Sequence, residues 1–389
     1  MFILIFSICC INIKLMKAQV NLIIASSETD SNLYYATRFL APDPFIFLQI
    51  GDEKIMIMSD LEIGRAKVQA KVDTVLSHSI YEAEAKKKGV LDPKTIDVLN
   101  EFLHERGIKD LMVPADFAIR HALLLQEKGY AIVVKSDPFF EERLKKNEKE
   151  IGYIAETLHH AENAIDKAIG FIRDTVIKDG YLYSGEKAVT SEDIKRLIAV
   201  YLLENGFIAL HTIVSCGEDT VSPHTEGAGP LKADMPVIID LFPRSMTNRY
   251  YADITRTVVK GRASHEVKEM YEAVLSAQGV AISLIRDGTN GKEVHEAILK
   301  HFKSLGYESG EIKGRMQGFF HGTGHGVGLD VHEPPRISKR EDILQAGNVV
   351  TVEPGLYYSG IGGVRLEDMV IVQENGVKNL TRYPKTLEV

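Results

Sequence analysis

The second half of the chain repeats one order of predicted elements, two helices followed by strands, and this repeat constrains the fold more than any other feature. Helical and strand-like spacing of apolar residues defines both copies. The first copy comprises helices at about 147–178 and from Thr190 onwards, and strands at 208–214, 237–241 and 250–259. The second comprises helices at about 264–286 and 292–305, and strands at 349–353 and 364–372. The repeat predicts two related halves packed face to face.

The first third of the chain follows a different pattern. Over 20–138, short β-rich runs such as IFLQIG, KIMIMS and YAIVVK alternate with helical segments at 92–106 and 119–128. This alternation predicts an α/β layer domain. Because 389 residues are long for a single core, we expect two domains, an N-terminal α/β domain at 16–140 and a second domain at 147–389.

Composition excludes several classes of partner. The net charge is -8 and the basic residues form no clustered stripe, so the chain lacks the surface that nucleic-acid binding requires. Cys9, Cys10 and Cys216 are too few for a disulfide framework, which predicts a cytoplasmic protein in a reducing compartment. The first 15 residues are apolar but lack a basic start and a cleavage site, and they are too short to span a bilayer. We therefore expect translation to begin at Met16, and no membrane association.

Two aspartates stand where apolar strands are predicted. Asp240 ends the run MPVIIDL, and Asp253 shares one face of YYADITRTVV with Thr255 and Thr257. If the intervening residues close a hairpin about their middle, Asp240 and Asp253 lie roughly opposite each other, with Cβ atoms about 4.5–5.5 Å apart. Like charges at that distance call for a cation between them. The alternative is one exposed aspartate and one turn aspartate with no shared role.

Three of the 13 histidines, His321, His325 and His332, fall within HGTGHGVGLDVHEPP. His321 and His325 are four residues apart, as in helical zinc sites, but position 322 is glycine rather than the glutamate of an H-E-x-x-H motif. Glycines at alternate positions argue against a helix and allow the backbone to approach a ligand closely. A lone histidine is more often a hydrogen-bonded core residue, whereas three beside a glycine ladder favour a site.

Two glutamates and an arginine complete the set of charges. Glu353 ends a strand that runs into Pro354, and Glu367 lies within an apolar strand, where an unpaired carboxylate is costly. Arg365 is two residues earlier on the same face, so it is placed to bind a carboxylate or to orient Glu367. The alternative is an Arg365–Glu367 pair on a solvated edge strand.

Together these segments supply four carboxylates and at least one imidazole, a donor set that suits a hard or borderline divalent ion. Mn²⁺ is the expected metal, with Co²⁺, Fe²⁺ or Zn²⁺ as alternatives. Four carboxylates exceed the charge that one such ion neutralises. We therefore expect two ions about 3.5–4 Å apart that share a bridging hydroxide.

The spacing of Asp240, Asp253, His325 in HGTGHGVG, Glu353 in VEPG and Glu367 in RLED resembles the ligand set of the pita-bread metallopeptidases. That family includes aminopeptidase P, prolidase, methionine aminopeptidase and the metal-free creatinase. The resemblance covers the second half of the chain and implies an α+β catalytic domain with a curved, mostly antiparallel sheet and a pseudo-twofold repeat. NLYYATRF with APDPFIFL resembles the creatinase-N-like domain of the aminopeptidase P and prolidase branch. One departure is that twelve residues, rather than the more usual ten, separate the two aspartates.

The resemblance also implies roles for the metal ligands. Asp240 would bind one metal and His325 the other. Asp253 and Glu367 would bridge both metals, and Glu353 would be both a ligand and the general base.

Further residues match the family's pocket. His224, in SPHTEGAG, and His332 match outer-sphere histidines that hydrogen-bond the scissile carbonyl or the intermediate. His321 matches a substrate-binding histidine of the proline-directed branch, and Arg365 is the second residue we expect to bind substrate.

Three functions follow as alternatives. The first is an exopeptidase that hydrolyses the Xaa-Pro bond of dipeptides or at the N-terminus of peptides, so its partner is a peptide with proline in second position. The second is a methionine aminopeptidase, which the additional N-terminal domain and Arg365 disfavour. The third is a non-peptidase hydrolase or binding protein, which the five filled ligand positions disfavour. We also expect a homodimer, because relatives of this length are commonly dimers or larger.

Overall fold

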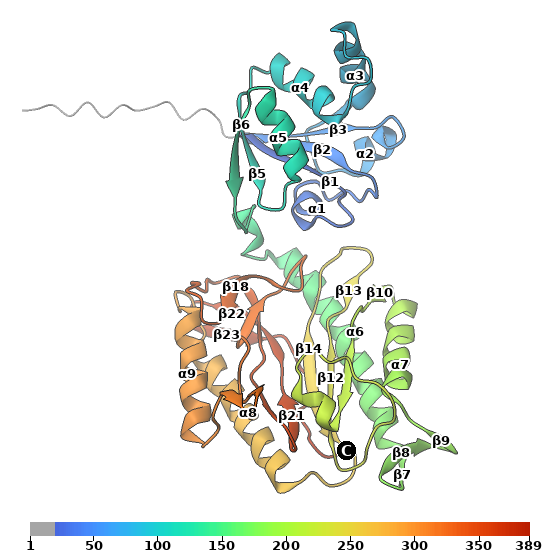
Figure 1. Cartoon of the computed structure of the whole chain (residues 1–389), viewed down its shortest axis with the longest axis vertical. Coiled ribbons are helices and arrows are strands. Elements are labelled where there is room, and N and C mark those ends of the chain that lie inside the picture. The colour runs from blue at the N-terminus through green and yellow to red at the C-terminus, as the bar shows by residue number, and fades with distance from the viewer. Residues whose placement is uncertain (1–19) are drawn as a thin grey trace, which may run out of the picture. The chain divides into compact units, whose positions relative to one another are not determined.

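The computed structural model describes residues 20–389, and it divides the chain into two compact units, one ending at Phe140 and the other beginning at Glu141 (Figure 1). The predicted start at Met16 and the apolar run before it lie outside the described residues. No helix in the described part of the chain combines the length and the apolar composition needed to cross a bilayer.

The first unit is built on a six-stranded sheet in the order β4-β3-β2-β1-β5-β6, in which β1, β2 and β3 pair antiparallel and the other neighbours pair parallel. Its strands are β1 (Val20–Ala25), β2 (Phe45–Ile50), β3 (Glu53–Met58), β4 (Thr74–Ser77), β5 (Asp110–Pro114) and β6 (Ala131–Lys135). Its helices are α1 (Ser31–Thr37), α2 (Ile63–Gln69), α3 (His78–Lys87), α4 (Thr95–Glu105) and α5 (Ile119–Glu127).

Both faces of this sheet are buried. Along β2, Ile46 and Leu48 belong to a cluster with α4, whereas Phe45 and Phe47 belong to a cluster with α1. This alternation follows from the two-residue period of a strand. The unit therefore has the α/β layer architecture that the sequence predicts.

The second unit contains two pairs of long helices. These are α6 (Glu148–Arg173) with α7 (Ser191–Glu204), and α8 (His265–Leu284) with α9 (Gly291–Ser304). Reciprocal hydrogen bonds between the side chain and backbone of Asn147 and Glu150 cap the start of α6. The prediction that this helix continues to 178 is wrong, because the β-branched Val176 and Ile177 leave it and pair with β8 (Tyr181–Ser184) as strand β7 (Val176–Lys178).

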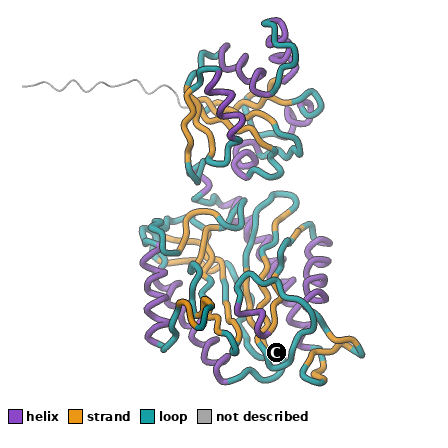
Figure 2. The backbone as a smooth tube through the Cα atoms, in the orientation of Figure 1, coloured by secondary structure: helices purple, strands orange, loops and turns teal. Residues whose placement is uncertain are grey.

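Antiparallel sheets lie between the helix pairs, as Figure 2 shows. The first half contributes β11 (Ile213–Cys216), β12 (Pro236–Leu241) and β14 (Ile254–Val259). The second contributes β17 (Gly324–Gly326), β18 (Glu333–Ile337), β19 (Val349–Val352), β22 (Asp368–Gln373) and β23 (Gly376–Asn379), with β20 (Gly355–Tyr358) and β21 (Gly362–Arg365) as a separate pair. Shorter elements are β9 (Lys187–Ala188), β10 (Phe207–Ile208), β13 (Arg244–Ser245), β15 (Gly310–Ile312), β16 (Arg315–Gln317), η1 (Glu141–Arg143) and η2 (Gly217–Val221).

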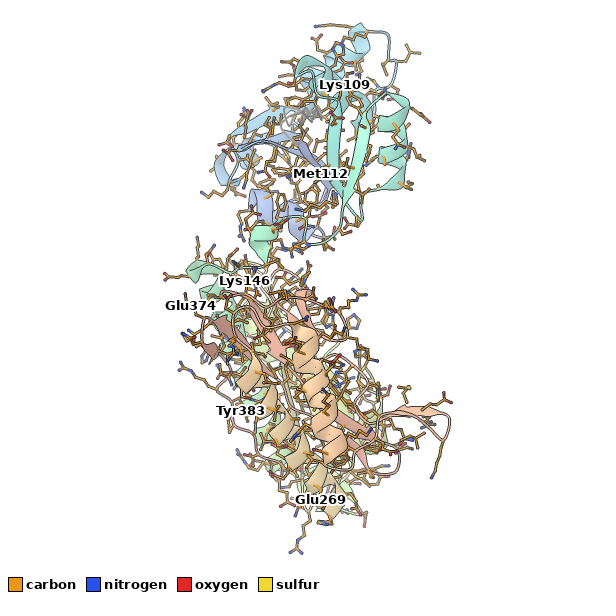
Figure 3. All side chains as sticks on the ribbon, turned by 90° about the vertical axis from the view of Figure 1, so that its left-hand side faces the viewer. Lys109, Met112, Lys146, Glu269, Glu374 and Tyr383 are labelled. Carbon is orange, nitrogen blue, oxygen red and sulfur yellow. The ribbon has the colours of Figure 1, made fainter. Side chains whose placement is uncertain are left out.

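The order of two helices followed by antiparallel strands occurs twice, as the sequence predicts. In the second half, Val274 and Ala277 of α8 pack against Val350 of β19 and Val370 of β22 in one buried cluster. The opposite side of α8, which carries Glu269, is exposed (Figure 3). The sheets therefore have a helix-covered outer face and a second face that is available for a pocket.

Candidate metal centre

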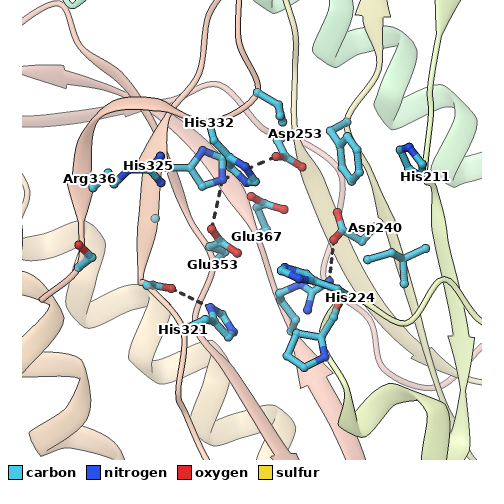
Figure 4. A pocket seen from close by; sticks show the side chains of 18 of the residues that line it. His211, His224, Asp240, Asp253, His321, His325, His332, Arg336, Glu353 and Glu367 are labelled. Atoms are coloured by element: carbon cyan, nitrogen blue, oxygen red, sulfur yellow. Dashed lines mark hydrogen bonds and ion pairs between the residues drawn. The ribbon is translucent and has the colours of Figure 1, made fainter. Parts of the chain in front are cut away.

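The five predicted metal ligands converge on one pocket of about 680 Å³ (Figure 4). Asp240 lies within β12, Asp253 directly precedes β14, and His325 lies in β17. Glu353 follows the last residue of β19, and Glu367 lies between β21 and β22. The structure thus brings together residues that are up to 127 positions apart in the sequence, as 240 and 367 are.

The register of the first two carboxylates differs from the predicted one. Asp240 lies opposite Thr255, not opposite Asp253. The strand expected from 250 begins only at Ile254. Just before it, Tyr251 makes an isolated bridge to Arg244 of β13 and so is not part of the β14 ladder. Asp253 is two residues before Thr255, the residue that pairs with Asp240. Because side chains two residues apart along a strand point to the same face, the two carboxylates still face one pocket.

Asp253, His325 and Glu367 form the core of the site. One ligand atom from each lies within 4.8 Å of the others, and all three residues are buried. His325 Nε2 lies 3.8 Å from Asp253 Oδ2 and 3.3 Å from Glu353 Oε1. This is a carboxylate-and-imidazole cluster of the kind that binds borderline divalent ions.

The electrostatics of the cluster favour a bound cation. Burial, and then the charges of Glu367, Asp240 and Glu353, raise the pKa of Asp253 well above its usual value. Burial and the charges of Glu353 and Asp240 do the same to the pKa of Glu367. Among the described residues, no hydrogen-bond partner reaches the buried Oδ1 atoms of Asp240 and Asp253. Oxygens that are buried, repelled and unpartnered fit a divalent metal.

Glu353 differs from its neighbours. Burial raises the pKa of this carboxyl, but the hydrogen bond and charge of His325 outweigh burial and leave the pKa at about 2. Glu353 is therefore ionised at neutral pH. An ionised carboxylate at the edge of the cluster can accept a proton.

Arg365 contacts a carboxylate, and that carboxylate belongs to Asp240. Its guanidinium lies 2.6 Å from Asp240 Oδ2 and 2.8 Å from the Tyr357 hydroxyl, and the residue is 3% exposed. The alternative of an Arg365–Glu367 pair on a solvated edge strand does not hold, because both residues are buried and Arg365 ends β21 while Glu367 lies beyond it. Glu367 instead accepts a 2.8 Å hydrogen bond from the Thr255 hydroxyl. Arg365 thus compensates the charge of Asp240 directly.

His321 is part of a hydrogen-bonded chain. Its Nδ1 lies 2.8 Å from the carbonyl of Gly322, so Nδ1 must carry the proton. Its Nε2, 2.9 Å from the Tyr357 hydroxyl, therefore accepts from that tyrosine, which in turn accepts from Arg365. Burial lowers the pKa of His321 to about 4, so the ring is neutral. The ring is held by groups on both nitrogens.

The other two histidines line the pocket. The His332 ring lies 4.3 Å from the His325 ring and nearly perpendicular to it, and burial followed by the charge of His325 lowers the pKa of His332 to about 4. His224 lines the pocket near Asp240 (Figure 4). All three predicted pocket histidines therefore lie around the cluster.

The glycine ladder has a packing role that the sequence analysis did not foresee. A Cβ at Gly324 would lie 2.0 Å from the carbonyl oxygen of Thr351, and one at Gly326 would lie 2.4 Å from that of Pro334. These glycines allow neighbouring backbone segments to approach the strand that carries His325. The close approach that these two glycines permit is between strands.

A buried ionic cluster beside His332 was not predicted. Arg143 donates to Asp330 at 2.8 Å and to Glu333 at 2.9 Å, and Lys146 pairs with the second oxygen of Glu333. The sequence offered little signal, because a charged stretch such as FFEERLKKNEKE is ordinarily a solvated surface. The cluster ties the segment after the glycine ladder to the start of α6. Tyr357, Arg336 and Arg340, which also contribute to the site or its lining, were likewise not singled out.

The comparisons with known proteins agree with this geometry. A model of metallopeptidase family M24 matches residues 153–374, more than half of the chain. The chain therefore belongs to metallopeptidase family M24, and the predicted metallopeptidase fold is confirmed.

Similar proteins carry two kinds of name. The chain is 30% identical over 345 residues to an Xaa-Pro dipeptidase from Pyrococcus furiosus, a match that covers 87% of each chain. An Xaa-Pro dipeptidase structure from Bacillus anthracis matches with a TM-score of 0.80 and 26% identity, over 96% of this chain and 95% of the other. An X-Pro aminopeptidase structure from Thermotoga maritima matches with a TM-score of 0.77 and 26% identity, over 96% and 98%.

Proposed function

We propose that this protein is an exopeptidase that hydrolyses the bond before proline, in Xaa-Pro dipeptides or at the N-terminus of longer peptides, with two divalent ions, Mn²⁺ by preference. The observation that carries the proposal is the buried cluster of Asp253, His325 and Glu367 within a family of metallopeptidases. The proline preference rests on the names of the similar proteins from Pyrococcus, Bacillus and Thermotoga.

Each ligand has a proposed role. Asp240 would hold one ion and His325 the other, Asp253 and Glu367 would be shared by both ions, and Glu353 would complete the ligand set. Bound divalent ions supply Lewis-acid polarisation of the scissile carbonyl and lower the pKa of a water molecule. Glu353 accepts the proton of the attacking water and transfers it to the proline nitrogen as the bond breaks, which its ionised state allows.

The pocket histidines stabilise charge on the substrate. His224 and His332 lie on different segments around the cluster, and both line the pocket. An imidazole N–H directed at the developing oxyanion strengthens its hydrogen bond in the transition state. His321 is held by Tyr357 and Gly322, so we assign it to shaping the substrate pocket.

The pocket lining favours a short substrate. Arg336 and Arg340 line the same pocket, and no ion pair of either guanidinium occurs among the described residues. A dipeptide places its carboxylate close to the scissile bond, where a guanidinium binds it well. We therefore propose that dipeptides are the preferred substrates. We also propose that the protein is cytoplasmic and homodimeric, with its domains at 16–140 and 147–389.

Cleavage rates of the metal-loaded protein on three substrates, Gly-Pro, Gly-Pro-amide and Gly-Pro-Leu, test this function. We expect cleavage of Gly-Pro with added Mn²⁺, slower cleavage of the amide, and a smaller difference between the two in Arg336→Gln. Equal rates on all three substrates would favour an aminopeptidase. No cleavage of any, with metal bound, would contradict the proline-directed function, and cleavage of a Met-Gly peptide instead would favour methionine aminopeptidase.

A further inference from the structure

One buried amide connects the two glutamates of the site. Gln278 lies in the middle of α8 and is 1% exposed, on a helix face that otherwise buries apolar residues such as Val274 and Ala281. A buried side-chain amide is costly unless its donors are satisfied. Its contacts therefore indicate what the residue does.

The amide nitrogen of Gln278 donates to two backbone carbonyls. It lies 2.9 Å from the carbonyl oxygen of Val352 and 3.2 Å from that of Leu366. Val352 directly precedes Glu353, and Leu366 directly precedes Glu367. A single NH2 group therefore bridges the two peptide units from which both glutamates project.

Each of these peptide units is also held at its other end. The N–H of Glu353 donates to the carbonyl of Thr323 at 2.8 Å, and the N–H of Glu367 donates to the carbonyl of Thr255 at 3.1 Å. The carbonyl end of each unit is the end that Gln278 holds. With both ends fixed, each peptide plane has little freedom to rotate, which restrains the backbone from which each glutamate side chain extends.

The ladder between β19 and β22 stops one residue short of both glutamates. The last paired residue of β19 is Val352, and Glu367 lies between the end of β21 at Arg365 and the start of β22 at Asp368. Both glutamates thus stand just beyond regular pairing. Val352 pairs with Asp368, so the ladder brings the two segments together, and Gln278 extends the restraint one step further, to the peptide units of the two glutamates.

We propose that Gln278 is a positioning residue of the metal centre, which holds Glu353 and Glu367 at the separation needed to bind the same metal ions. The inference rests on the metal centre assigned above but not on the identity of the substrate. Outer groups that orient ligands typically change metal affinity by about 10- to 100-fold when they are removed. Gln278 acts through backbone carbonyls of the ligand-bearing segments and touches neither carboxylate in the contacts above.

Metal titration of the full-length protein tests this role. Gln278→Met keeps the approximate volume but removes both donors, and Gln278→Asn keeps the amide but is too short to reach both carbonyls. Val274→Ala is the matched control, because Val274 is fully buried on the same helix and belongs to its apolar packing cluster. Each protein is freed of metal with chelator and titrated calorimetrically with Mn²⁺, and its Tm is measured without metal.

We expect Gln278→Met and Gln278→Asn to weaken Mn²⁺ binding by about 10- to 100-fold. Val274→Ala should lower the metal-free Tm yet leave Mn²⁺ affinity within about twofold, since its loss is one of packing. If one Gln278 variant does not fold, the other decides the outcome. Wild-type affinity in a folded Gln278 variant, or an equal loss of affinity in Val274→Ala, would overturn the proposal. A wild-type protein that binds Mn²⁺ but cleaves no Xaa-Pro substrate would contradict only the proposed function.

Discussion

The two halves of the second unit bring their carboxylates to the pocket in different ways. In the first half, Asp240 lies inside the β12–β14 ladder, opposite Thr255, and only Asp253 lies one residue beyond its end. In the second half, Glu353 and Glu367 both lie one residue beyond the Val352–Asp368 pair that ends the β19–β22 ladder, and Gln278 of α8 connects their peptide units. A repeated architecture therefore does not repeat the support of its ligands. Where the ladder ends, a side chain from the covering helix takes its place.

The halves also differ in how their charges are compensated. Asp240 has a buried guanidinium at 2.6 Å, that of Arg365, which comes from the other half. Asp253 has the His325 ring at 3.8 Å, and its pKa is raised well above the usual value by burial and by the carboxylates around it. Asp240 therefore has a protein cation of its own, whereas Asp253 is surrounded by other carboxylates and the His325 ring.

The largest effect should follow from removing the charge of Asp253. Asp253→Asn takes a charge and a donor atom from the centre of the cluster, so Mn²⁺ binding should be lost or greatly weakened and cleavage of Gly-Pro should fall by more than roughly 1,000-fold. Metal content by mass spectrometry and kcat/KM measure the two effects. Asp174→Asn, at the exposed end of α6, is the matched control and should change neither. Near-normal turnover in Asp253→Asn would place the active site elsewhere.

Removal of the guanidinium tests the contrast between the two aspartates. Arg365→Met leaves Asp240 buried without its cation, and breaking a buried ion pair in this way costs about 3–5 kcal/mol of folding free energy. We expect that loss in urea unfolding of the metal-free protein, with partial recovery when Mn²⁺ is added. Lys195→Met, on the partly exposed surface of α7, should have little effect. Unchanged stability in Arg365→Met would mean that Asp240 does not depend on the arginine.

The sequence predicts most of the site but little of its support. Asp240 and Glu353 could be identified because a carboxylate within or at the end of an apolar strand needs a specific partner. The ladder register, with Asp240 opposite Thr255, could not be predicted, because residue spacing does not show where a long connection turns. Gln278 gave no signal at all, since one glutamine on a helix is usually exposed, and its role depends on two carbonyls that are distant in sequence.

A smaller effect should follow from removing either of the two outer histidines, His224 of the first half and His332 of the second. His224→Ala and His332→Ala each remove a donor proposed to face the oxyanion, so kcat should fall by roughly 100- to 1,000-fold while both metal ions stay bound. Metal content and single-turnover rates on Gly-Pro measure this. His159→Ala, on the exposed surface of α6, is the control and should retain full activity. If His224→Ala loses metal and His332→Ala does not, then His224 is a ligand and the two halves are less alike than proposed.

The smallest effect is a pH dependence of the metal-free protein. The pKa values of Asp253 and Glu367 are raised in the folded state, so their protonated forms contribute stability below the unfolded pKa values, near 4. That contribution is lost as the pH rises through the folded-state pKa values. Between about pH 5 and about pH 8, the Tm of chelator-treated protein should therefore fall more than that of Mn²⁺-saturated protein, by a few degrees. Asp253→Asn should show a shallower fall without metal, because it removes one of the repelling charges. An equal slope in metal-free wild type and variant would mean that Asp253 has a cationic partner after all, as Asp240 does.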